Sequence, residues 1–121
     1  MEKKVEEQFL YDIYGELLTD KQKLILDYYY NDDYNLAEIA ELVHVTRQGV
    51  YDSVKRSKAT METYEEKLGL LQRFLRERRL LNESIREIKQ LLTEETVKQD
   101  AGLSSELVEI QEKLMKISEN N

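Results

Sequence analysis

The 121-residue chain has no cysteine, no proline and no tryptophan, and it has only four glycines. Without cysteine, it can form neither disulfides nor thiolate metal sites. Without proline, and with so few glycines, little interrupts helices or supplies the turns that a β-sheet needs. No long apolar run resembles a signal peptide or a membrane span. These absences predict an all-α protein of the cytoplasm that makes no contact with the membrane.

The signatures of catalysis are missing as well. With one histidine, His44, and no cysteine, a single copy of the chain cannot assemble a transition-metal cluster. The glycines form no loop that could cradle a phosphate, and no arrangement of Ser, His and Asp is recognisable. We therefore expect no enzyme, no bound metal and no cofactor.

The charge is acidic overall but unevenly distributed. The formal net charge is −7, which counts against indiscriminate binding of polyanions. Residues 1–43 carry a net −7, residues 44–60 a net +3, and residues 61–121 a net −3. This distribution is typical of an acidic protein that binds DNA through one small surface.

The basic segment coincides with a helix-turn-helix pattern at residues 36–58. One apolar stripe predicts a first helix, and a second stripe predicts a helix that starts at Thr46 and packs against it. The two stripes are Leu36, Ile39, Ala40 and Val43, then Val50, Val54 and Met61. His44 occupies the turn, and histidine tolerates the left-handed backbone conformation that such a turn requires.

The second helix of this motif presents a polar face able to hydrogen-bond base edges and neutralise phosphates. Its candidate nucleic-acid-binding residues are Arg47, Gln48, Tyr51, Asp52, Lys55, Arg56 and Lys58. Two positions leave the role open. Asp52 can accept from a cytosine amino group but repels phosphate, and Gly49 lowers helix propensity by about 1 kcal/mol.

Two further helices are expected before the motif. The first covers about residues 4–17, with an apolar stripe formed by Val5, Phe9, Ile13 and Leu17 and widened by Leu10 and Tyr14. Thr19 and Gln22 form a capping-box pattern that begins the second, whose buried face is Leu24, Ile25, Tyr28 and Tyr29. Asn35 caps the third helix. We expect the tyrosines at 28–30 and 34 to pack in a core rather than stack on bases, and residues 1–62 to form one four-helix domain.

Residues 63–121 change to heptad spacing, which predicts a helical hairpin or coiled-coil extension. Because two helices seldom bury enough apolar surface alone, these seams predict a homo-oligomer, with a dimer favoured. The candidate oligomerisation residues are Leu71, Phe74, Leu81, Ile85, Ile88, Leu92, Leu107, Ile110, Leu114 and Ile117, with Arg78 and Leu103 also in the seams. Arg73, Arg76, Arg78 and Arg79 are expected to form ion pairs on a solvated face.

Residues 18–61 resemble the region-4 helix-turn-helix of bacterial sigma factors, through Leu18-Thr19, Glu38-Ile39-Ala40, Val45-Thr46-Arg47 and Val50. Over nearly its whole length, including LYDIYGELLTDKQ and VTRQGVYDSVKR, the chain resembles the YlxM family. The resemblance implies a helix-turn-helix regulator that binds DNA. It also implies a link to the signal recognition particle, so that binding of the particle's RNA or of a protein component is the alternative.

Overall fold

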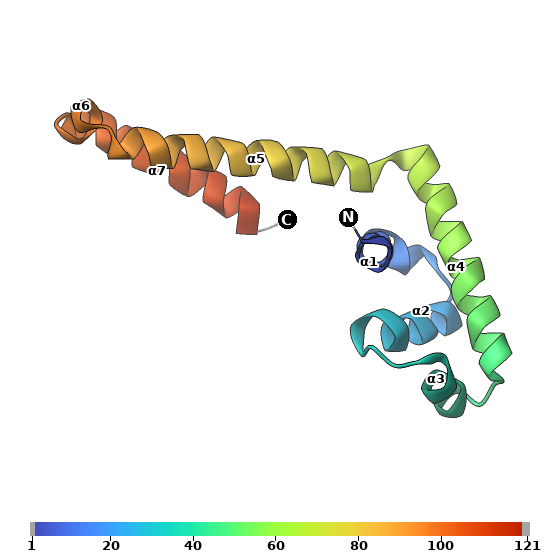
Figure 1. Cartoon of the computed structure of the whole chain (residues 1–121). Helices are drawn as coiled ribbons and strands as arrows, with labels where there is room; N and C mark the ends of the chain where they lie inside the picture. The colour runs from blue at the N-terminus through green and yellow to red at the C-terminus, as the bar shows by residue number, and fades with distance from the viewer. Residues whose placement is uncertain (1, 120–121) are drawn as a thin grey trace. The chain divides into compact units, whose positions relative to one another are not determined.

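The computed structural model describes residues 2–119, which contain seven α-helices and two shorter helical turns (Figure 1). In order they are α1 (Lys3–Tyr14), the 3₁₀ turn η1 (Gly15–Leu17), α2 (Asp20–Leu26), the π-helical turn η2 (Asp27–Asn31), α3 (Leu36–Val43), α4 (Arg47–Leu68), α5 (Leu70–Thr93), α6 (Glu95–Lys98) and α7 (Ala101–Glu119). The all-α prediction is confirmed. None of these helices is both long and apolar enough to cross a membrane.

The chain divides into two compact units, one ending at Leu71 and the other starting at Gln72. The boundary expected from the sequence lies at residue 62, but α4 continues past it to Leu68. Gly69 ends this helix because it adopts the left-handed conformation, with φ of 62°. Leu71 is only 3% exposed and belongs to the first unit.

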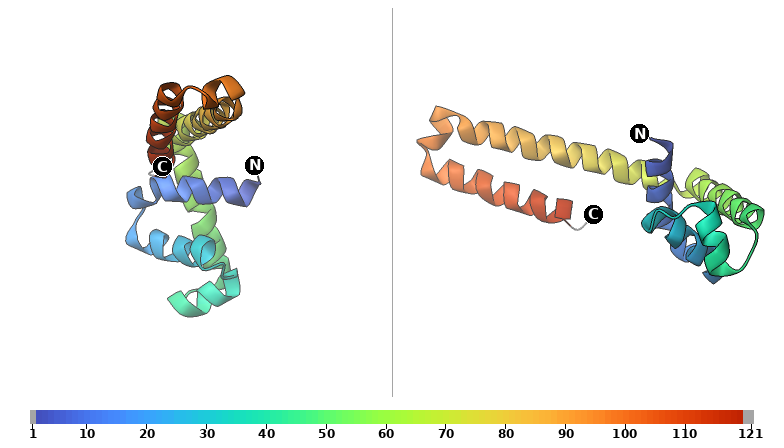
Figure 2. Two further views of the ribbon diagram at one scale, coloured as in Figure 1. Left: turned by 90° about the vertical axis from the view of Figure 1, so that its left-hand side faces the viewer. Right: turned by 60° about the horizontal axis from the view of Figure 1, so that its bottom comes forward.

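In the first unit, α1, α2 and α3 all pack against the long helix α4 (Figures 1 and 2). Each contributes one apolar side, as expected of amphipathic helices around a shared core. The buried apolar side chains are Leu10, Tyr11, Tyr14, Leu18, Ile25, Leu26, Tyr30, Ile39, Ala40, Val50, Val54, Met61 and Leu71.

The buried sides of α1 and α2 agree with the predicted ones in part. In α1, Leu10 and Tyr14 of the predicted stripe are buried, whereas Val5 is 43% exposed. The α-helix also ends at Tyr14, so Leu17 lies in η1 and is 58% exposed. Steps of four residues drift around a helix of 3.6 residues per turn, and the partner helix selects one row among the apolar ones.

In α2 the predicted Ile25 is buried, but Leu24 is 46% exposed, and Leu26, which was not predicted, is fully buried. The predicted caps are confirmed, since both Thr19 and Asn35 form capping boxes with the residue three positions later. Among the tyrosines that follow α2, Tyr30 is buried and Tyr28 stacks on Tyr34. The core-packing prediction is confirmed for Tyr30.

Three tyrosine–carboxylate hydrogen bonds join the helices of the first unit. The hydroxyls of Tyr11 and Tyr14 donate to Asp27 and Glu65 at 2.6 Å, and Tyr30 donates to Glu7 at 3.3 Å; Asp27, Glu65 and Glu7 lie on other elements. Burial, reinforced by these carboxylates, raises the pKa of all three phenols above the ordinary value. The phenols therefore remain neutral donors at physiological pH.

The second unit is a helical hairpin in which α5 and α7 run antiparallel, joined through α6 (Figures 1 and 2). The predicted turn at residues 93–102 contains α6. Arg78 of α5 donates from its guanidinium to the carbonyl and the hydroxyl of Ser118 near the end of α7. Of the clustered arginines, Arg73 forms the expected ion pair, with Glu77 at 2.9 Å.

Candidate nucleic-acid interface

The turn between α3 and α4 is fixed by residues at its two ends. His44 adopts the left-handed conformation, with φ of 58°, and its backbone N–H donates to the carbonyl of Ala40. Thr46 then caps α4, where its hydroxyl accepts the N–H of Gly49 at 3.0 Å. His44 therefore occupies the turn position that the sequence predicts, and α4 begins directly after Thr46.

The contact with Thr46 gives a local structural reason for a glycine at position 49. A Cβ built at this position would lie 3.1 Å from the capping hydroxyl of Thr46, which is tighter than ordinary van der Waals contact. A side chain would therefore press on the atom that caps the helix. Gly49 keeps the cap intact at some cost in helix propensity.

The first turns of α4 have one buried and one exposed side. Val50 and Val54 are buried, and α3 packs against α4. Because residues three and four apart share a helix face, this packing turns the polar residues outward. The exposed ones are Arg47, Gln48, Tyr51, Asp52, Lys55 and Arg56.

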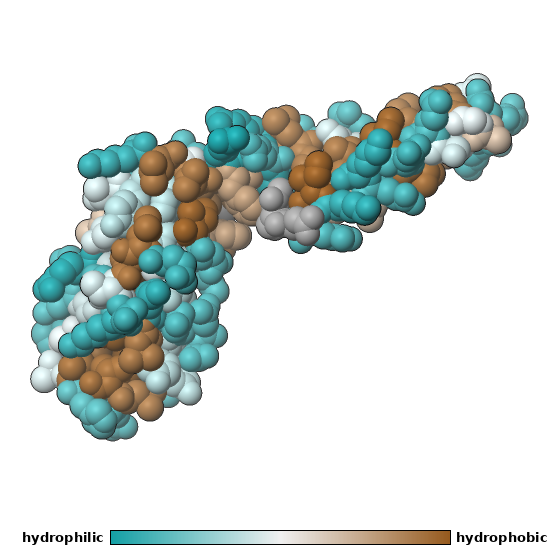
Figure 3. All heavy atoms as spheres, turned by 180° about the vertical axis from the view of Figure 1, so that it is seen from behind, coloured by the Kyte–Doolittle hydropathy of each residue, from teal (hydrophilic) through white to brown (hydrophobic). Residues whose placement is uncertain are grey.

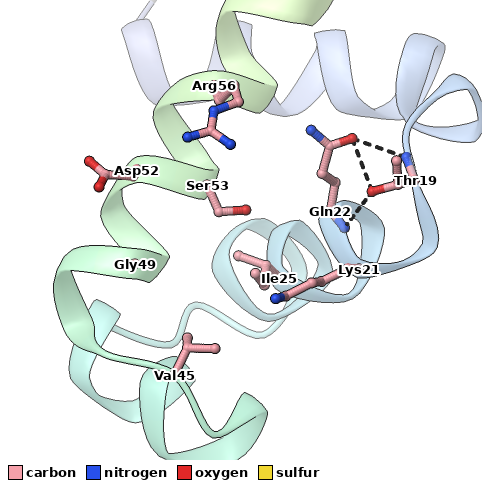
Figure 4. A pocket seen from close by; sticks show the side chains of 9 residues that line it. All are labelled: Thr19, Lys21, Gln22, Ile25, Val45, Gly49, Asp52, Ser53 and Arg56. Atoms are coloured by element: carbon pink, nitrogen blue, oxygen red, sulfur yellow. Dashed lines mark hydrogen bonds between the residues drawn. The ribbon is translucent and has the colours of Figure 1, made fainter.

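Two of these exposed residues are linked to each other. The side-chain amide of Gln48 donates to the carboxylate of Asp52 at 3.1 Å, one helical turn away. The carboxylate is therefore held beside an amide donor, and in Figure 4 it extends away from the neighbouring hollow. Gln48 and Asp52 form a unit that presents both donors and acceptors, which suits base edges better than phosphates.

Lys58 differs from the other candidate residues, because its ammonium is engaged inside the first unit. It forms an ion pair at 3.1 Å with Glu7, and the two side chains are 27% and 8% exposed. The same ammonium lies 5.8 Å from the centre of the Tyr29 ring. Lys58 neutralises a buried carboxylate, and we leave it out of the proposed interface.

Two positive groups that the sequence patterns did not single out lie near this surface. Lys4 of α1 sits 5.0 Å from the centre of the Tyr29 ring and pairs with Asp33 at 3.1 Å. Lys21 of α2 lines a hollow together with Ser53 and Arg56 of α4 (Figure 4). No sequence pattern signals Lys21, because the packing of α2 against α4 brings it there.

The expected oligomerisation residues occupy different environments. Leu71 is part of the core of the first unit, whereas Phe74, Leu81, Ile85, Ile88 and Leu92 form a half-buried row along α5. On α7, the half-buried row is Ser104, Leu107, Gln111, Leu114 and Ser118. Ile110 and Ile117 are 46% and 51% exposed, so they lie outside this row.

Comparison with known proteins shows which family the chain resembles in sequence. Residues 1–103 match the sequence model of a family described as "Putative helix-turn-helix protein, YlxM / p13 like". A UPF0122 protein of Acetivibrio thermocellus is 41% identical over 120 residues, which cover 99% of this chain and all of the relative. A UPF0122 protein of Bacillus cereus strain AH187 is 47% identical over 95 residues, 78% of this chain and 83% of the relative. One from Geobacillus kaustophilus is 49% identical over 81 residues, 67% and 74% of the two chains.

Proposed function

The chain belongs to the YlxM / p13-like family of helix-turn-helix proteins, and from this premise we propose that it is a regulatory protein that binds duplex DNA through the start of α4. The observation that carries the proposal is the exposed face of α4, which combines Arg47, the Gln48–Asp52 unit, Tyr51 and Lys55. A helix of this kind fits the major groove, where side chains at its first turns reach base edges.

The roles follow from the chemistry of each side chain. Arg47, at the first position of α4, has the donor fork that recognises guanine, and the Gln48–Asp52 unit offers hydrogen bonds to adenine or cytosine. Tyr51 is 47% exposed and supplies an apolar contact as well as a hydroxyl. Lys55 and Arg56 would hold phosphates on either side of the groove.

A single module of this size gives limited contact with DNA, and two-fold pairing is the usual way to extend it. The hairpin of the second unit carries exposed apolar side chains, visible in the space-filling view (Figure 3). On α7 they include Leu103, Ile110 and Ile117, which are seven residues apart. We propose that this row pairs two copies of the chain into a four-helix arrangement, because the half-buried row of α7 is partly polar and leaves these apolar side chains exposed.

The acidic charge balance favours a second candidate function. With a net charge of −7, non-specific attraction to duplex DNA is weak, and the same basic face of α4 offers a surface for structured RNA or for an acidic protein. Under this second hypothesis, the protein is an accessory factor of the signal recognition particle and binds either the RNA or a protein component of the particle.

A salt-resolved titration of the full chain separates the two. Promoter duplexes from its own locus, mixed-sequence duplex and signal recognition particle RNA would be compared at several ionic strengths. We expect Arg47→Ala to weaken the preferred duplex by about 1–3 kcal/mol and relax selectivity, and Lys55→Ala to weaken all duplexes alike. Arg73→Ala, in the second unit, is the matched control and should change neither. Tight RNA binding without duplex binding at low salt would overturn the DNA proposal in favour of the second candidate.

A further inference from the structure

A hollow of about 470 Å³ lies between the start of α2 and the start of α4 (Figure 4). Two cationic side chains line it, one from each helix: Lys21 from α2 and Arg56 from α4. Its wall on the α4 side continues through Gly49 and Asp52, so it opens beside the face described above.

The two cations of this hollow have no carboxylate partner among the described residues, whereas four other basic side chains are ion-paired. The acidic groups nearby are otherwise engaged. Asp52 accepts from Gln48 and its carboxylate points away from the hollow, and Asp20, the neighbour of Lys21, lies 3.9 Å from Lys23. The lining therefore carries two positive charges, Lys21 and Arg56, against the single negative charge of Asp52, although the chain is acidic overall.

The uncharged polar groups of the hollow are hydrogen-bond donors too. Ser53 is half-buried and directs its hydroxyl into the hollow (Figure 4). Gln22 uses its carbonyl oxygen to accept the backbone N–H of Thr19 at 3.0 Å, which leaves its amide N–H groups on the side of the hollow. Ammonium, guanidinium, hydroxyl and amide donors around one space match an anion with several acceptor oxygens.

Resting on the proposed function, we infer that this hollow is a phosphate subsite, in which Lys21, Arg56 and Ser53 hold a backbone phosphodiester of the duplex that α4 enters. At about 470 Å³ the hollow is larger than one phosphate group. Arg56 and Ser53 lie on the flank of α4, and a phosphate strand passes beside a helix that occupies the major groove. Lys21 then fixes the register of α4 on the duplex without reading its sequence.

The test compares Lys21→Gln with Lys67→Gln in the full chain. Lys67 is an exposed lysine of the same unit at the other end of α4, so both variants lose one charge. Each phosphate contact contributes about 0.9 to the slope of log affinity against log salt concentration. The loss of one contact therefore changes the ratio of the affinities at 50 and 200 mM salt about threefold. We expect Lys21→Gln to reduce the steepness of this slope by about 0.9, the value of one phosphate contact, on every duplex sequence tested, without a change in sequence selectivity. We expect Lys67→Gln to leave the slope unchanged. An unchanged slope for Lys21→Gln, while Arg47→Ala still weakens binding, would overturn the subsite and leave the proposed function standing.

If the unaltered chain binds no duplex, the proposed function fails and the subsite is decided with inorganic phosphate. Amide chemical shifts of Gln22 and Ser53 would be followed while phosphate is added to the chain and to Lys21→Gln. Saturable shifts that the substitution abolishes would support an anion site that serves another phosphate-bearing ligand. The absence of such shifts would overturn it.

Discussion

Replacing Lys58 by alanine tests whether this residue supports the fold or contacts DNA. The substitution leaves the Glu7 carboxylate, which is 8% exposed, without its ion pair, so that among the described residues only the Tyr30 hydroxyl, at 3.3 Å, still donates a hydrogen bond to it. Removing one partner of a fully buried ion pair costs about 3–5 kcal/mol, whereas an exposed pair contributes about 0–1 kcal/mol. Lys58 is 27% exposed, so we expect a loss of roughly 2 kcal/mol in the free energy of unfolding.

The assay is urea unfolding of the full chain followed by circular dichroism, with Lys55→Ala as the matched control. Lys55 lies one turn earlier on α4, is exposed and has no ion pair among the described residues, so its loss should change stability by less than about 0.5 kcal/mol. At a typical urea dependence, the Lys58 variant should unfold at a denaturant concentration lower by roughly 1 M. The double variant Glu7→Gln with Lys58→Met should recover much of the loss, because neither charge is then left unpaired.

The duplex affinities of the same variants complete the test. We expect Lys55→Ala to weaken DNA binding without loss of stability, and Lys58→Ala to do the reverse. If Lys58→Ala proved as stable as the unaltered chain and bound DNA less well, the assignment of Lys58 to the core would be wrong.

Three other results are expected. Tyr14→Phe should lower the free energy of unfolding by about 1.5–3 kcal/mol, because the hydrogen bond to Glu65 is lost. Tyr64→Phe is the control and should cost little, because the Tyr64 hydroxyl has no hydrogen bond among the described residues. Equal losses of the two variants in urea unfolding would contradict this prediction. Because the pKa values of the buried tyrosines are raised in the folded chain, their phenols ionise at a lower pH in the unfolded chain than in the folded one. The free energy of unfolding should therefore keep its full value below about pH 10 and fall above it. A free energy of unfolding that does not change across this range would refute the prediction. Ile110→Lys should shift the chain from dimer to monomer in sedimentation equilibrium, and a monomeric unaltered chain would contradict the proposed pairing.

The local features of the fold could be predicted from the sequence. Thr19 and Asn35 cap helices as expected, the second helix of the motif starts at Thr46, and His44 takes the left-handed turn position. Such features depend on residues a few positions apart, so their chemistry is visible in the sequence.

Features that depend on packing between distant segments were not predictable. The partner of Lys58 is on α1, and Lys21 reaches the candidate interface only because α2 packs on α4. The half-buried row of α7 includes Ser104 and Gln111, so steps of three and four between apolar residues did not fix which side of the helix is covered. When polar residues share an interface, periodicity alone does not determine its phase.

The most direct test of DNA binding by α4 is a map of amide chemical shifts in the full chain during titration with duplex DNA. We predict that the largest changes fall on residues 46–56 and at the start of α2, beside Lys21, and that residues 72–119 change little. Changes confined to the hairpin, or no saturable change at low salt, would contradict the account.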